Sequence, residues 1–244
     1  MQSGLDAKAA TREAWACGDY HRFAKATVWE VGPVLVGACG IGPGQRVLDV
    51  AAGSGNVAIR AAEAGANVVA ADLTPAGFEA GRREAHACGV RLDPLELDAA
   101  ELTRVCRPGG TIGLASFTPE SLVPAFFEVF APYMPPSSGG SLPPVLWGRE
   151  EHVRELFADR VSWLRLERRV YVERAADPAA YCALCKETFG PIVTVYESLR
   201  DDPDAVAALD RSFLDFATRS STGLLGGSAE YPYEYLLAVA RTAV

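Results

Sequence analysis

The chain has 244 residues, of which 49% are hydrophobic and 22% charged, and its formal net charge is −8 at pH 7. This length suits one α/β domain with a single core. The negative charge argues against nucleic acid or a membrane surface as partners, because both favour basic proteins. No apolar run reaches the roughly 20 residues of a membrane-spanning helix, and the start, MQSGLDAKAATREAW, lacks the apolar core of a signal peptide.

Short apolar runs alternate with helical patterns through the first half of the chain. A helical cover from about Asp6 to Cys39 comes first and ends at a glycine-rich break, Gly40–Gly44. In chain order, the expected elements are then strand Arg46–Val50, helix Asn56–Gly65, strand Asn67–Ala71, helix Pro75–Gly89, strand Arg91–Leu97, helix Ala100–Cys106 and strand Thr111–Phe117. This alternation predicts an α/β fold with a mostly parallel sheet and helices on both faces.

The second half is predicted to be helical, with C-terminal strands. We expect helices at Glu150–Ala158, Pro178–Gly190 and Asp204–Thr218, an exposed strand at Val161–Glu173 and a final antiparallel strand at Tyr233–Val244. No linker is long enough to separate two domains, so one domain over 1–244 is predicted.

Six cysteines are scattered along the chain, at Cys17, Cys39, Cys88, Cys106, Cys182 and Cys185. Dispersed cysteines are typical of reduced proteins, which predicts a cytoplasmic location. Cys182 and Cys185 form a C-x-x-C pattern, but no second ligand pair accompanies them and the three histidines are not spaced as ligands. We therefore predict no metal site here, and interpret both cysteines as small apolar residues of a helix.

The stretch VLDVAAGSGNVAIRAA, Val47 to Ala62, passes from a strand through a small-residue turn into a helix. Gly53 and Gly55 let the backbone approach a ligand closely. The helix that begins near Asn56 presents free N–H groups and the positive end of its dipole to the turn. Asp72 ends the next strand, where a carboxylate can accept hydrogen bonds from a ribose diol. These features predict a nucleotide-cofactor loop.

Two classes of cofactor are compatible with the glycines alone. Gly53–Ala58 matches the dinucleotide pattern G-x-G-x-x-A. Asp49, however, lies inside the first strand, where a carboxylate would repel a pyrophosphate but could hold a cation such as the amino group of a methionine moiety. The segment Asp49–Gly55 therefore resembles motif I of the class I, Rossmann-like S-adenosylmethionine-dependent methyltransferases.

Further segments carry this resemblance, especially to the ubiquinone/menaquinone-methylase-like group that acts on small molecules. They are Trp15–Tyr20, Val69–Pro75, Leu97–Ala99, Leu102–Gly110, Thr111–Glu120 and Leu146–Val153. The resemblance implies S-adenosylmethionine as cofactor, with contacts at Tyr20, Asp49, Ala51, Gly53, Ser54, Gly55, Asp72, Leu73, Asp98 and Ala99. It places Asp72 on the ribose hydroxyls and Asp98 on the adenine amino group, and Ala99 would offer its backbone N–H. It also divides the single domain into a helical cover (about 1–40), a cofactor-binding core (about 45–117) and a helical insertion with C-terminal strands (about 118–244).

The chain departs from this family after Asp98. The resemblance implies a fourth strand beside the first and a long helix after it, but Asp98-Ala99 leads almost directly into Ala100–Cys106. One strand-plus-helix unit, on the order of thirty residues, is absent. Because an unpaired strand edge inside a sheet is costly, we predict that the Thr111–Phe117 strand pairs with Arg46–Val50 in its place.

The sequence favours methyl transfer from S-adenosylmethionine to oxygen, nitrogen or carbon of a small-molecule acceptor, and allows a homodimer. One alternative is a non-catalytic cofactor-binding scaffold or an inactive deletion variant. A nicotinamide-dependent oxidoreductase fits less well, because Ala51 stands where that loop expects its first glycine. The catalytic residue stays unassigned. Candidate acceptor contacts are Tyr20, His21, Ser116, Trp147 and Tyr196, of which His21 could act as a general base.

Overall fold

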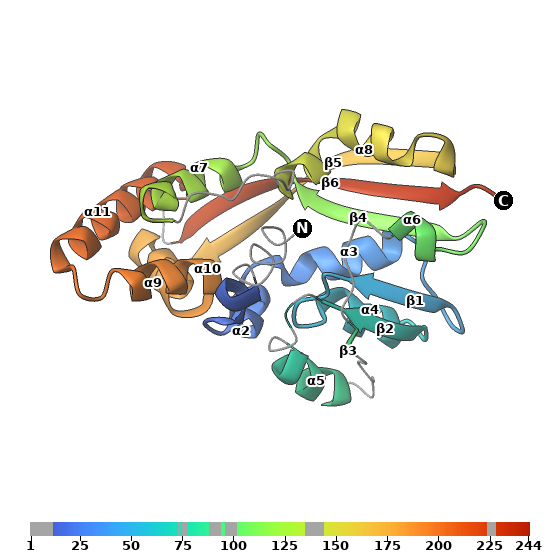
Figure 1. The fold of residues 1–244 in the computed structure, drawn as a ribbon, viewed down its shortest axis with the longest axis horizontal. Coiled ribbons are helices and arrows are strands. Elements are labelled where there is room, and N and C mark those ends of the chain that lie inside the picture. Colours follow the sequence, from blue (N-terminus) through green and yellow to red (C-terminus); the bar gives the residue numbers. More distant parts are fainter. Residues whose placement is uncertain are drawn as a thin grey trace, which may run out of the picture. The chain divides into compact units, whose positions relative to one another are not determined.

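The computed structural model describes residues 12–72, 74, 78–87, 94–95, 102–134, 144–223 and 228–244. The chain forms two compact units. The first, here called the helical unit, consists of Met1–Thr27, Glu120–Leu142 and Val172–Tyr233. The second, the sheet unit, consists of Val28–Pro119, Pro143–Tyr171 and Glu234–Val244 (Figure 1). Both units are assembled from three separate segments, and the single domain over 1–244 stays a prediction.

The first sheet is parallel and has the strand order β1-β2-β3, with β1 at Arg46–Val50, β2 at Asn67–Ala71 and β3 at Pro94–Leu95. The register pairs Val50 with Ala71, and the Ala52 N–H extends the ladder by donating to the Ala71 carbonyl at 3.0 Å. The connecting helices are α4 (Asn56–Glu63) and α5 (Phe78–Ala87). The predicted bounds of β1 and β2 are confirmed. They could be predicted because both strands are short apolar runs closed by small residues.

The second sheet has the order β4-β6-β5, with β4 at Thr111–Phe117, β6 at Ala229–Thr242 and β5 at Val161–Ala175. β4 and β6 are antiparallel, from Thr111 opposite Arg241 to Phe117 opposite Tyr235. Helix α6 (Leu102–Val105) precedes β4, and a 3-10 segment, η5 (Pro144–Gly148), leads into α8 (Glu150–Phe157). Alternate residues of β6 form a buried core with α8 and with one residue of β4: Ile112, Val153, Phe157, Leu236, Ala238 and Ala240. The predicted α/β class with antiparallel C-terminal strands is therefore confirmed.

The prediction that the Thr111–Phe117 strand pairs with Arg46–Val50 is wrong. β1 pairs with β2 and β4 pairs with β6, so each of β1 and β4 ends its sheet within the described part of the chain. Helix α3 (Val31–Ala38) packs against both α4 and β4. A Cβ at Gly113 of β4 would lie 3.0 Å from Leu35 Cδ1 and closer still to Cys39 Sγ. Packing of α3 thus sets the spacing of the two sheets, and the parallel part of the fold is limited to β1-β2-β3.

The helical unit contains α2 (Tyr20–Ala26), α7 (Leu122–Phe130), α9 (Pro178–Thr188), α10 (Gly190–Ser198) and α11 (Pro203–Ser220). Four of these helices begin at an N-cap whose side chain accepts from a backbone N–H: Asp19, Ser121, Asp177 and Asp202. Their core is aromatic and includes Phe126, Phe130, Phe189, Phe213 and Phe216. The sequence patterns did not predict α7, which contains Pro124, or α10, whose Gly190-Pro191 start is typical of a break.

The expected N-terminal helical cover is interrupted. Within its described residues α2, a 3-10 turn η1 (Val28–Glu30) and α3 follow one another, and residues 1–11 lie outside the described part. Cys182 and Cys185 both lie on α9, where both are buried, in agreement with their interpretation as apolar helix residues.

Thr242 ties the turn before β4 to the end of β6. Its hydroxyl donates to the Arg107 carbonyl at 2.7 Å and accepts from the Gly110 N–H at 2.9 Å, and the side chain is buried. Thr242→Val should therefore lower the free energy of unfolding by about 1–3 kcal/mol, because the Arg107 carbonyl and the Gly110 N–H, which also bond each other at 2.9 Å, each lose a hydrogen bond to the hydroxyl. Urea denaturation measures this change. Thr242→Ser is the matched control and should stay within about 1 kcal/mol of the wild type; equal losses for both variants would contradict the bonding role.

Candidate functional site

The loop after β1 has an unusual backbone. Ala51, Gly53 and Gly55 have φ values of 57°, 56° and 90°, and the Gly55 N–H donates to the Ala52 carbonyl at 2.7 Å. Positive φ is routine for glycine but strained for alanine. Gly55 is the N-cap of α4 and offers no side chain to its free N–H groups. The loop therefore brings backbone donors close to any group bound above the carboxyl end of β1.

Asp49 supports this loop from beneath. Its side chain is buried, and Oδ2 accepts from the Ala58 N–H in the first turn of α4 at 2.9 Å. Burial raises the pKa of the Asp49 carboxyl to about 7; the Ala58 hydrogen bond opposes the rise and the charge of Asp72 adds to it. Near neutral pH the group therefore lies close to its titration point, and a neighbouring cation would favour the carboxylate.

Asp72, which follows β2, also hydrogen-bonds to the loop. Its Oδ2 accepts from the Gly53 N–H at 2.8 Å, and its Oδ1 accepts from the Thr74 N–H at 2.7 Å. An ionised carboxylate can accept about four hydrogen bonds. Asp72 therefore keeps capacity for further donors, such as a pair of hydroxyl groups, while it holds the loop.

Ser54 provides a buried polar atom that the described residues leave without a hydrogen bond. The residue is 1% exposed, and its Oγ has no partner in this part of the chain. Buried hydroxyl groups are rarely left unsatisfied in folded proteins. The Ser54 hydroxyl, the Asp49 carboxyl and the free capacity of Asp72 are the features expected where a polar cofactor is held, so these residues fit S-adenosylmethionine.

Two contacts that the sequence patterns missed position this loop. Gly81 of α5 lies directly against the Ser54 backbone carbonyl, where an added Cβ would overlap it. Asn56 Nδ2 donates to the Val28 carbonyl at 3.0 Å and joins α4 to η1. A glycine inside a helix is the one sequence signal that could have indicated the first contact.

The structure brings together the cofactor residues predicted on the first two strands and their loops. Asp49, Ala51, Gly53, Ser54, Gly55 and Asp72 meet at the carboxyl ends of β1 and β2. Leu73, Asp98 and Ala99 lie outside the described residues. Tyr20 and His21 lie on α2 in the helical unit. Among the described residues, no group of three or more His, Cys, Asp or Glu side chains could hold a metal ion.

The remaining candidate acceptor contacts are dispersed. Ser116 lies near the end of β4, and Trp147 lies in η5 with its ring 6.3 Å from that of His152. Tyr196 lies on α10, where its hydroxyl donates to Asp210 Oδ1 at 2.8 Å. None of these three side chains is joined to the glycine loop by a described hydrogen bond.

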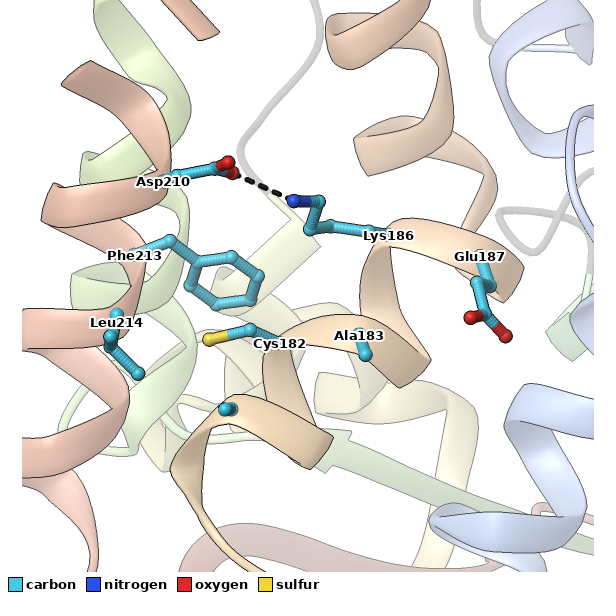
Figure 2. Close-up of a pocket in the computed structure, with 8 residues that line it drawn as sticks. Cys182, Ala183, Lys186, Glu187, Asp210, Phe213 and Leu214 are labelled. Carbon is cyan, nitrogen blue, oxygen red and sulfur yellow. Dashed lines mark hydrogen bonds and ion pairs between the residues drawn. The ribbon is translucent and has the colours of Figure 1, made fainter. Parts of the chain in front are cut away.

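A groove of about 390 Å³ lies in the helical unit between α9 and α11 (Figure 2). Its lining comprises Ala179, Cys182, Ala183, Lys186, Glu187, Asp210, Phe213 and Leu214. The Lys186 ammonium is 2.7 Å from Asp210 Oδ1 and 4.6 Å from the centre of the Tyr196 ring. Lys186 therefore lies in an ion pair, as the dashed line in Figure 2 shows.

Three titratable groups in or beside this groove have shifted pKa values: Asp210, Tyr196 and Cys182. Partial burial works to raise the pKa of Asp210, but hydrogen bonds from Lys186 and Tyr196 keep it below its usual range. Burial, followed by the bond to Asp210, raises the pKa of Tyr196, and burial raises that of Cys182 to about 12. Tyr196 and Cys182 therefore stay protonated at neutral pH, so neither of them offers a base or a nucleophile to a molecule in the groove.

Comparisons with known proteins also indicate a methyltransferase domain around the loop after β1. A methyltransferase domain family matches residues 47–112, from β1 into β4. Uncharacterized protein Mb1438c of Mycobacterium bovis is 38% identical over 260 residues, which cover 94% of this chain and 93% of that protein. The demethylmenaquinone methyltransferase of Renibacterium salmoninarum is 32% identical over 126 residues, or 41% of this chain and 53% of that protein. Among solved structures, YcgJ from Bacillus subtilis has a TM-score of 0.50 at 15% identity and covers 86% of this chain and 97% of its own.

The alignment with the Mycobacterium bovis protein also bears on the shortened segment. It is 260 positions long, which exceeds the 244 residues of this chain, yet it covers only 94% of them. The relative therefore carries residues that this chain lacks, as expected of an internal deletion. YcgJ, at its low identity, shows a shared fold and no more.

Gly81 should be essential for the shape of the loop. An alanine in the middle of a helix normally stabilises it by about 0.5–1 kcal/mol relative to glycine, but Gly81→Ala must displace the Ser54 carbonyl, which costs about 1–3 kcal/mol. We expect a net loss of stability in thermal or urea unfolding. Gly37→Ala in α3, where a Cβ would meet nothing within 4 Å, is the matched control and should be neutral or stabilising. Equal gains for both variants would show that α5 does not press on the loop.

Proposed function

Because the chain belongs to the class I, Rossmann-like S-adenosylmethionine-dependent methyltransferases, we propose that it transfers a methyl group to an oxygen, nitrogen or carbon atom of a small-molecule acceptor. S-adenosylmethionine is the cofactor, and when bound it supplies a methyl group activated by attachment to a sulfonium centre. The observation that carries the proposal is the buried Asp49 carboxyl beneath the Ala51–Gly55 loop, with Asp72 bonded to the same loop.

We infer that the loop residues hold the cofactor through distinct chemistry. Asp49 would accept from the cofactor ammonium group, whose charge compensates the buried carboxylate. Asp72 would use its remaining acceptor capacity on the ribose hydroxyls, and Ser54 would satisfy its buried hydroxyl on a polar group of the cofactor. The positive-φ turn at Ala51, Gly53 and Gly55 would bring the backbone close. Contacts from Tyr20, Leu73, Asp98 and Ala99 stay part of the proposal on the strength of the family resemblance.

Catalysis in this proposal depends mainly on positioning. A nucleophile aligned with an activated methyl group needs chiefly proximity and orientation, and a protein base is required only where the acceptor must lose a proton. His21 on α2 stays the candidate for that base, on the ground of its residue type and half-buried place. Tyr196 is the poorer candidate, because its hydroxyl proton is bonded to Asp210.

Charge and cysteine state bear on the partners and the location. The net charge of −8 supports a small-molecule acceptor over nucleic acid or a lipid surface. The described helices include none long and apolar enough to cross a membrane. Cys17, Cys39, Cys106, Cys182 and Cys185 are all free thiols, which supports the cytoplasm as the place of action. We also propose that the protein forms a homodimer.

One specific observation favours the alternative, a cofactor-binding scaffold that does not turn over. β1 and β4 each end a sheet among the described residues, and the Mycobacterium bovis relative carries residues that this chain lacks. In the family, as the sequence resemblance implies, the absent strand forms one wall of the methyl-transfer pocket. The loop thus supports binding more directly than it supports catalysis.

The protonation of Asp49 should control cofactor affinity. Because its pKa in the folded protein is raised to about 7, the carboxyl is largely neutral at pH 5.5 and largely ionised at pH 7.5. Affinity for S-adenosylmethionine, measured by isothermal titration, should rise by about tenfold or more over this range, since one pKa unit corresponds to a factor of ten. Asp49→Asn should bind more weakly at pH 7.5 and show no such rise. Asp201→Asn, at an almost fully exposed carboxylate, is the control.

The stability of the free protein should show the opposite trend. A carboxyl whose folded pKa is raised favours folding while protonated, and this contribution is lost as the pH rises through about 7. The stability of Asp49→Asn relative to wild type should therefore increase from pH 5.5 to pH 7.5. A pH-independent difference, together with pH-independent affinity, would contradict the assignment of Asp49.

A chimaera distinguishes an enzyme from a scaffold. It carries the additional residues of the Mycobacterium bovis relative, inserted between Ala99 and Leu102. We expect the native chain to bind S-adenosylmethionine and to methylate an acceptor in a panel of phenols and quinols that includes demethylmenaquinone, with transfer followed by mass spectrometry. Cofactor binding without turnover by the native chain, and turnover by the chimaera alone, would establish the scaffold instead. Loss of binding by the native chain would contradict both.

A further inference from the structure

One long strand edge is open in the sheet unit. β5 ends the second sheet, and no described strand pairs with its other edge. Its part within the sheet unit, Val161–Tyr171, carries two unusually exposed apolar side chains, Trp163 at 50% and Val170 at 58% exposure. An open edge presents unpaired N–H and C=O groups and is a template for pairing with another chain. β5 is also longer than β1 and β4, which likewise end their sheets.

On one face of this edge the charges alternate in sign, while Arg168 on the other face is paired with Glu150 and Glu234 of its own chain. Arg165, Glu167 and Arg169 lie on one face together with Trp163, because side chains alternate along a strand. Arg169 Nε is 2.8 Å from Glu167 Oε1 within the chain. Charged side chains, especially lysines, commonly protect an exposed edge from association. This mixed row can instead complement a copy of itself.

A two-fold axis restricts the registers in which this edge could pair with itself. In a symmetric antiparallel pair, one residue lies opposite its own copy, and opposite residues share a face. The axis could pass through any of the five central residues, Arg165 to Arg169. Four of these are charged, so an axis through one of them would set it opposite an identical charge. Leu166 is the uncharged one. With Leu166 on the axis, Arg165 of one copy lies opposite Glu167 of the other, and Trp163 lies opposite Arg169. By symmetry, each of these pairs occurs twice.

We propose that this edge is a homodimer interface in which residues 161–171 of two copies pair antiparallel about an axis through Leu166. Glu167 then lies between Arg169 of its own chain and Arg165 of the second copy. Trp163 is covered by the guanidinium of Arg169, a favourable cation–π arrangement. On the other face Val170 lies diagonal to Leu164 of the second copy, within reach of apolar contact. Both exposed apolar side chains thereby gain neighbours, and the proposal is independent of methyl transfer.

Cross-linking tests the register. Leu166→Cys places two thiols on the axis, where Cα atoms of opposite residues are about 4.5–5.5 Å apart, within the range of a disulfide. Oxidation of the full-length variant should give a covalent dimer on a non-reducing gel. Ser162→Cys is the matched control on the same strand, because its two copies would be about 26 Å apart. Wild type, with its native cysteines, is the second control. Equal cross-linking of all three proteins would overturn the register.

Charge reversal tests the interface without introducing cysteine. Arg165→Glu sets two glutamates against each other across the interface, and Glu167→Arg sets two arginines against each other; the double variant restores the opposite-charge pairing. Sedimentation should show dimeric wild type, at least tenfold weaker association of each single variant and recovery in the double variant. Trp163→Arg, at an exposed site, should also dissociate the dimer and serves if a charge variant fails to fold. Wild type that is monomeric at about 100 μM, or single variants that stay dimeric, would overturn the proposal.

Discussion

A buried carboxyl group at the end of β1 is the constraint on which the cofactor loop depends. Asp49 accepts from the Ala58 N–H and thereby fixes the start of α4. Asp72 holds the opposite side of the loop through Gly53. Burial of the Asp49 carboxyl raises the free energy of its ionised form in the empty site, and the charge of Asp72 adds to that cost, in line with the raised pKa of Asp49. A cation bound beside Asp49 would relieve that cost, so the same interaction shapes the loop and favours a cofactor with an ammonium group.

The division of the strands into two three-stranded sheets has a different origin. α3 packs on α4 at one side and on β4 at the other, with Gly113 against Leu35 and Cys39. β4 satisfies one edge along its full length by pairing with β6. The remaining edges of β1 and β4 lie where the family resemblance implies another strand. The loop after β1 nevertheless keeps a form that fits the cofactor.

In the helical unit, several polar side chains are held in hydrogen bonds or in a protonated form, which makes them unreactive. In the groove between α9 and α11, Lys186 and Tyr196 both bond to Asp210, and the Cys182 thiol stays protonated because it is buried. Residue types that suggest reactivity in the sequence are structural here. The open edge of β5 is the reverse case: its charged residues, ordinary in the sequence, lie in an order that is self-complementary across a two-fold axis.

The sequence by itself determined the features that depend on near neighbours along the chain. The bounds of β1, β2 and β4, the glycine loop and the acids Asp49 and Asp72 follow from short patterns of apolar, small and acidic residues. The tertiary structure decided what depends on distant segments: that β4 pairs with β6 and not β1, that Gly81 presses on Ser54, and that Asp49 titrates near pH 7. Strand pairing and burial are set by the packing of elements such as α3, which no local pattern encodes.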